Sequence, residues 1–145
     1  MAPLQKRALI TFLIGLVFSA ALAVVLVLEG DPTAFEDSEF IRWIMYIALV
    51  GVPLSYLLLI DFSLRKPTEL DERDRLIMLR SGSVQWLAIA IALAGWTVGL
   101  TEVYWDTGEV PVAFLSLIFI SVLIISVVAR SLGILLGYWR TEANV

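Results

Sequence analysis

The sequence contains no cysteine and no histidine. The missing thiols exclude disulfides and thiolate chemistry. Without thiolate or imidazole, haem ligation by histidine and most zinc or iron sites are excluded as well. We therefore expect a chain without a metal or an organic cofactor.

Charge is also scarce. Only 17% of the 145 residues are charged, whereas 60% are hydrophobic, and the mean hydropathy is +0.92. A soluble domain of this size cannot bury so much apolar surface. A helix needs about 20 apolar residues to cross roughly 30 Å of hydrocarbon, and four stretches satisfy this at residues 8–28, 41–60, 84–101 and 112–131, the last extending toward Trp139. The prediction is a single integral membrane domain over residues 1–145, an all-α antiparallel bundle of four transmembrane helices.

The lysines and arginines are distributed unevenly among the segments that flank these stretches. All but Arg42 lie before the first stretch, between the second and third, or at the end of the fourth: Lys6, Arg7, Arg65, Lys66, Arg73, Arg75, Arg80, Arg130 and Arg140. The loops at 29–39 and 102–109 are acidic instead. Because cytoplasmic loops retain positive charge during insertion, we expect a multi-pass protein of the cell membrane with both termini in the cytoplasm.

The overall balance is acidic, with a net charge of −4 and a pI near 4.7. Nucleic-acid binding is not expected, since its usual footprint is a basic face. The expected partner of the spans is the lipid bilayer, and the more basic inner side favours a modest attraction to anionic headgroups.

A charged segment precedes the third span. Pro67 ends the preceding segment, and Thr68 with Asp71 forms a capping box. These signals predict a short amphipathic cytoplasmic helix from Thr68 to Arg80, which is either a solvated connector or a docking surface for a membrane or cytoplasmic protein. The candidate docking residues are Asp71, Glu72, Arg73, Asp74, Arg75, Arg80 and Arg140.

The run Asp71-Glu72-Arg73-Asp74, together with Arg130 and the terminal Gly137-Tyr138-Trp139-Arg140, resembles a family of uncharacterised small prokaryotic membrane proteins with four helices. That family carries an aspartate-glutamate-arginine signature before the third helix and an aromatic-arginine end to the fourth. The sequence departs from it with Val84-Gln85-Trp86 in place of alanine and tyrosines. The resemblance implies an architecture and no activity.

Small residues recur at helical spacing within the spans, and they predict close helix packing at Gly95, Gly99, Gly133 and Gly137. Packing within one chain is one interpretation, and a homodimer through Gly95 to Gly99 is the other. The serines of the fourth span are five residues apart, so we expect them to bond to their own helix. Arg130 at the inner boundary is predicted to pair with Asp61.

No acid lies inside any predicted span, which argues against an exporter that binds cations through a membrane-embedded glutamate. The favoured function is therefore a non-enzymatic accessory or regulatory protein that uses its inner-face patch. Two alternatives remain open. One is a small transporter or channel that acts as an oligomer, and the other is a lipid-modifying enzyme of the membrane interface that uses Asp71, Glu72 and Asp74.

Overall fold

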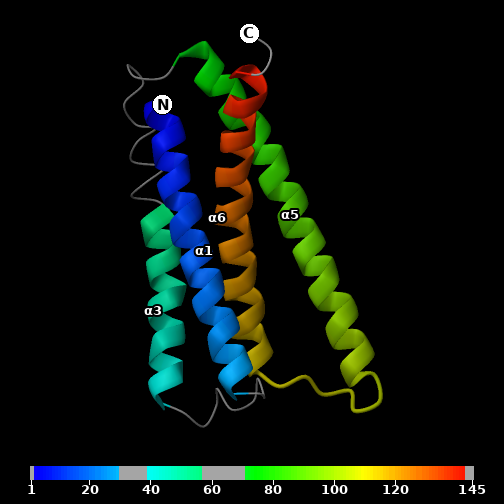
Figure 1. Ribbon diagram of the computed structural model, residues 1–145. Coiled ribbons are helices and arrows are strands. Elements are labelled where there is room, and N and C mark those ends of the chain that lie inside the picture. Colours follow the sequence, from blue (N-terminus) through cyan, green and yellow to red (C-terminus); the bar gives the residue numbers. More distant parts are fainter. Residues whose placement is uncertain (1, 30–38, 57–70, 143–145) are drawn as a thin grey trace.

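The computed structural model describes residues 2–29, 39–56 and 71–142, and these ranges are helical with no strand. Figure 1 shows four helices that run lengthwise beside one another: α1 (Pro3–Glu29), α3 (Glu39–Tyr56), α5 (Glu72–Tyr104) and α6 (Ala113–Glu142). Three of them are long and apolar enough to cross a membrane, over Pro3–Val24, Glu72–Tyr104 and Ala113–Arg140. The predicted all-α fold is thus confirmed, and three of its helices could cross a membrane.

The central element is α6, because α1, α3 and α5 all pack against it. In Figure 1 it lies between α1 and α5. Its buried side chains belong to two clusters, one toward each end of the helix. The first is Phe114, Leu117, Ile120, Ile124 and Val127. In the second, Ile134 and Tyr138 pack with Leu4 and Ala8 of α1 and with Ile77 of α5. The described core is therefore organised around one helix.

The pairing of α1 with α6 is antiparallel and close. Leu4 and Ala8 lie against the end of α6, whereas Gly15 lies farther back against Val128. A Cβ built on Gly15 would be only 2.6 Å from Cγ2 of Val128. Glycine at this position lets the two backbones approach, which is how helices associate in lipid.

The charged segment before the third span is not a separate helix. Asp71 is the N-cap, with extended backbone (φ −72°, ψ 162°) and a carboxylate that accepts a hydrogen bond from the Glu72 amide at 2.7 Å. From Glu72 the helix α5 continues for 33 residues to Tyr104. The predicted helix from Thr68 to Arg80 and the span 84–101 are thus merged, and Thr68 itself lies outside the described residues.

The physical reason for this continuity is the packing of Ser81 on α6. Ser81 is buried, and its Cα would be 3.1 Å from a Cβ built on Gly133. Its hydroxyl donates to the Met78 carbonyl oxygen at 2.7 Å, so no polar group is left exposed to the packing surface. This contact supports the helix through Ser81-Gly82-Ser83, where the sequence alone favours a break.

The four glycines predicted to pack helices divide into two pairs. A Cβ on Gly133 would meet Ser81, and one on Gly137 would lie 2.7 Å from Cγ2 of Ile77. Gly95 and Gly99 have no atom within 4 Å of a built Cβ, so packing within the described chain is wrong for them. Their side of α5 is exposed, and the homodimer through it stays a prediction.

The second and fourth predicted spans correspond to α3 and α6. The fourth is predicted at 112–131 with an extension toward Trp139, and α6 runs from Ala113 through Arg130 to Glu142. The second predicted span at 41–60 corresponds to α3, which begins at Glu39. Residues 57–60 lie outside the described ranges.

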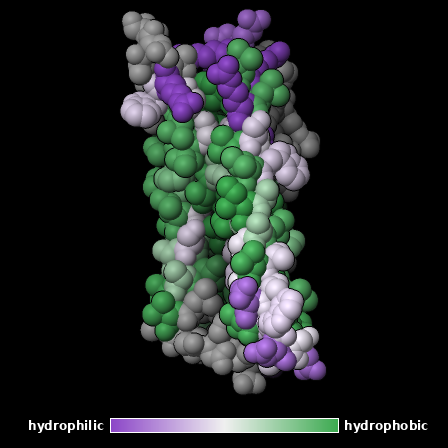
Figure 2. All heavy atoms as spheres, turned by 90° about the vertical axis from the view of Figure 1, so that its right-hand side faces the viewer, coloured by the Kyte–Doolittle hydropathy of each residue, from purple (hydrophilic) through white to green (hydrophobic). Residues whose placement is uncertain are grey.

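Hydrophilic side chains gather at the two ends of the molecule, and a broad apolar band separates them (Figure 2). Many large apolar side chains on this band are exposed, including Val17, Leu87, Ile91 and Val98. Exposed apolar area on this scale is costly in water and favourable in lipid. The surface therefore agrees with the span assignment.

Leucine placed at Gly137 should destabilise the protein, whereas leucine at Gly95 should not. Both changes replace a helical glycine with leucine and so raise the helix propensity equally. The difference in stability between the two variants therefore reports packing alone. The clash with the β-branched Ile77 is expected to cost about 1–3 kcal/mol. Thermal unfolding in detergent, followed by circular dichroism, measures this difference. Equal melting temperatures for the two variants would contradict the close contact, and loss of a dimer in Gly95→Leu would assign that face to self-association.

Candidate functional site

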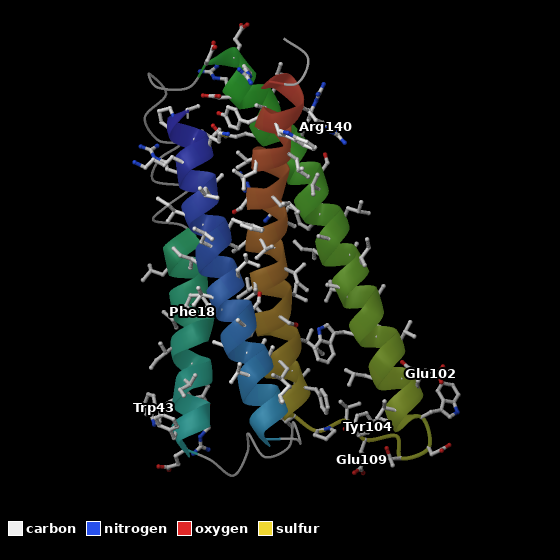
Figure 3. All side chains as sticks on the ribbon, in the orientation of Figure 1. Phe18, Trp43, Glu102, Tyr104, Glu109 and Arg140 are labelled. Atoms are coloured by element: carbon white, nitrogen blue, oxygen red, sulfur yellow. The ribbon has the colours of Figure 1, made fainter. Side chains whose placement is uncertain are left out.

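The basic side chains of the described residues are concentrated at one end of the molecule, where Asp71, Glu72 and Asp74 also lie. One end, here called the arginine-rich end, carries Lys6, Arg7, Arg73, Arg75, Arg80 and Arg140. The opposite end carries Glu39, Glu102, Asp106 and Glu109, with Arg42 in an ion pair to Glu39 at 3.6 Å. Figure 3 shows Arg140 at the first end and Glu102, Glu109 and Trp43 at the second. The candidate site is at the arginine-rich end.

A buried hydrogen bond joins α5 to α6 at this end. The Tyr138 hydroxyl donates to Oδ1 of Asp74, and the two residues are only 2% and 7% exposed. Apolar side chains surround the tyrosine ring, from Leu4 and Ala8 of α1 and Ile77 of α5. A buried carboxyl group needs such a partner because its desolvation is expensive. The bond therefore ties the first turn of α5 to the last turns of α6.

Six of the seven predicted docking residues are exposed: Asp71, Glu72, Arg73, Arg75, Arg80 and Arg140. Asp74 is the exception, and its assignment as a docking residue is wrong, because its carboxyl group is buried against Tyr138. Its position in the first helical turn also places it near the positive helix end, where an acid is favourable. Asp74 positions the helix turn that carries the other docking residues, and it does not form part of their exposed surface.

Arg73 is held over the tyrosine of the same contact. The central carbon of its guanidinium lies 5.5 Å from the centroid of the Tyr138 ring, which is within the range of a cation–π interaction. Tyr138 therefore contacts two neighbouring residues of α5, one through its hydroxyl and one through its face. Tyr138 and Asp74 are 64 positions apart, so the sequence carries no local signal of this contact.

Deeper along α6, Arg130 lies beside Gln85 of α5. An Nη atom of Arg130 is 3.5 Å from Oε1 of Gln85, and Nε2 of the same glutamine donates to the Ser126 hydroxyl at 2.7 Å. The predicted partner, Asp61, lies outside the described residues, so that ion pair stays a prediction. The sequence does not indicate the contact with Gln85, because this side chain is uncharged and lies 45 positions from Arg130.

The serines of α6 do more than bond to their own helix. Ser121 donates to the Ile118 carbonyl oxygen at 3.0 Å, as predicted, and also accepts from the Trp96 indole at 2.8 Å. Ser126 accepts from Gln85 of α5. Hydrogen bonds between helices satisfy polar groups that lipid cannot solvate. The predicted bond to the same helix is thus present for Ser121, and Ser121 and Ser126 also bond to side chains of α5.

The acids at this end do not converge. The Asp71 carboxylate caps the α5 amide of Glu72, whereas Asp74 bonds to Tyr138. Among the described residues no group of three or more histidine, cysteine, aspartate or glutamate side chains has a geometry that could hold a metal ion. The cation site considered for Asp71, Glu72 and Asp74 is therefore not assembled there.

Replacing Tyr138 with phenylalanine should destabilise the chain by about 1–3 kcal/mol, because the buried Asp74 carboxyl group loses its donor. Asp74→Asn should cost less, since its amide oxygen can still accept the hydroxyl. Thermal and denaturant unfolding in detergent provide the measurement. The matched control is Glu72→Gln, an exposed acid two residues away, whose effect should stay within about 0.5 kcal/mol. A Tyr138→Phe variant as stable as the parent would remove the assigned role.

No protein-family model, no curated protein and no solved structure matches this chain. The resemblance to the uncharacterised prokaryotic family therefore stays a prediction, and function has to be inferred from the residues and contacts of the chain itself.

Proposed function

We propose that the chain crosses the cell membrane four times, with α3 as the second span and both termini in the cytoplasm. The separation of charge supports this orientation, because the end rich in lysine and arginine is the one retained on the cytoplasmic side. The N-terminal turn of α1 and the C-terminal turns of α6 lie at that same end (Figure 1). Trp43, Tyr104 and Trp105 then occupy the opposite interface, where amphipathic rings are favoured.

The absence of cysteine makes this topology easy to test, since each introduced thiol is the only one in the chain. In intact cells or sealed right-side-out vesicles, a membrane-impermeant maleimide should label Glu109→Cys and leave Arg140→Cys unlabelled until detergent is added. The reverse pattern would invert the orientation. If both cysteines were labelled without detergent, the membrane would not protect the arginine-rich end from the reagent, and the proposed topology would be rejected.

The function that the site supports best is that of a non-enzymatic accessory or regulatory protein that docks a membrane or cytoplasmic protein. Its docking patch consists of Asp71, Glu72, Arg73, Arg75, Arg80 and Arg140. The observation that carries this proposal is the contrast between exposed charges and the buried Asp74–Tyr138 contact beneath them. A surface on a rigid helix end loses little entropy on binding, which favours recognition.

Mixed charges on such a patch give specificity through complementary charges on the partner. A contact of this kind weakens with salt, because exposed charges are screened beyond a Debye length of about 8 Å at physiological ionic strength. The proposed interaction is therefore reversible and depends on ionic strength, as suits a regulatory contact.

A photo-crosslinking residue at Arg75 should trap one specific protein in native membranes, and the adduct should decrease at high salt. Reversal of the neighbouring acids, in Asp71→Lys with Glu72→Lys, should abolish it. The control is the same crosslinker at Leu87, an exposed apolar residue of the same helix, which should label lipid. Labelling only of lipid or of other copies of the chain from Arg75 would reject protein docking.

A further inference from the structure

An apolar groove runs between α5 and α6 at the arginine-rich end. Its volume is about 600 Å³, and its apolar walls and floor are formed by Leu76, Ile77, Val84, Gly133, Leu136 and Gly137. The two glycines line this groove and also lie where α5 and α6 pack together. Figure 2 faces the α5 side of the molecule, where hydrophilic residues at this end adjoin the apolar band.

Three arginines and one acid complete the lining: Arg73, Arg80, Arg140 and Glu72. The groove therefore carries an excess of positive charge next to an apolar floor. Guanidinium groups bind phosphate through paired hydrogen bonds, and Arg is preferred to Lys for this geometry. Arg73 is already positioned by the Tyr138 ring, 5.5 Å from its guanidinium carbon. This reduces the entropy lost when it binds an anion.

The arginines and the glycine floor are separated along the helix axis. Arg140 is seven residues from Gly133, which corresponds to about 10 Å of helix at 1.5 Å per residue. Val84 lies one turn beyond Arg80 on α5, in the direction of the apolar band. A ligand that fills the groove must therefore be anionic at one end and apolar over the rest of its length.

We propose that this groove binds an anionic phospholipid, with the phosphate between Arg73, Arg80 and Arg140 and one acyl chain along the floor beside Gly133 and Gly137. The groove opens where the arginine-rich end meets the apolar band, which is the depth of lipid phosphates in a bilayer. A free anion would leave the apolar walls unused. The proposal depends on the membrane location of the chain and not on protein docking.

Native mass spectrometry of the full chain in detergent tests this directly, with phosphatidylglycerol and phosphatidylcholine of identical acyl chains as the two probes. We expect one phosphatidylglycerol to bind at least about fivefold more tightly than phosphatidylcholine. This lower bound is the factor that a single arginine gives, since each contributes about 1 kcal/mol near an anionic headgroup. An excess of inorganic phosphate should not displace it. Equal affinity for the two lipids, or displacement by phosphate, would overturn the proposal.

Paired variants locate the site. Arg80→Gln should lower the preference for phosphatidylglycerol by about fivefold, whereas Arg75→Gln, which removes the same charge from a position outside the groove, should leave it unchanged. Val84→Phe should fill the groove and weaken binding without altering charge, and Leu87→Phe is its control. Equal losses within either pair would show that lipid binds through general surface charge or general apolarity. That result would reject the groove while leaving the crosslinking test of protein docking unaffected.

Discussion

The close approach of α5 and α6 at the arginine-rich end is the contact on which the rest of the site depends. It is possible because Gly133 and Gly137 present no side chain to Ser81 and Ile77. Without a hydrophobic force to join helices in lipid, this packing and a few hydrogen bonds must hold the pair together. The Asp74–Tyr138 bond closes the pair where the helices leave the apolar band.

The same approach explains how polar groups persist inside an apolar protein. Thr11, Ser81 and Ser131 are almost completely buried, yet each hydroxyl donates to a carbonyl oxygen of its own helix. Farther along, Gln85 and Trp96 instead donate across to serines of α6. Small side chains whose hydroxyls are hydrogen-bonded to their own helix allow neighbouring helices to pack closely. Longer side chains bridge α5 and α6 where the two helices diverge (Figure 1). These polar side chains therefore serve to pack and join the helices.

The function proposed for the arginine-rich end depends on a division between buried and exposed groups. The Tyr138 hydroxyl and the Asp74 carboxyl group are hydrogen-bonded to each other, and the arginine side chains Arg73, Arg75, Arg80 and Arg140 are exposed at the surface. The groove shares Glu72, Arg73, Arg80 and Arg140 with the docking patch, and Arg75 and Asp71 lie outside its lining. Lipid occupancy would then change the charge that a protein partner meets.

Composition and the spacing of charges were sufficient to predict an all-α membrane protein, because a bilayer permits few solutions for apolar stretches of about 20 residues. The excess of lysine and arginine at one end could also be predicted, because it depends on residue counts along the sequence and not on contacts. Which glycines contact another helix could not be predicted: Gly95 and Gly133 each begin a pair of glycines four residues apart, but Gly133 packs against Ser81 whereas Gly95 lies on an exposed side of α5. Likewise, the burial of Asp74, the bridging by Tyr138 and the groove between Arg80 and Arg140 depend on residues more than 50 positions apart. Such pairs are brought together by tertiary packing, for which a single sequence carries no periodic signal.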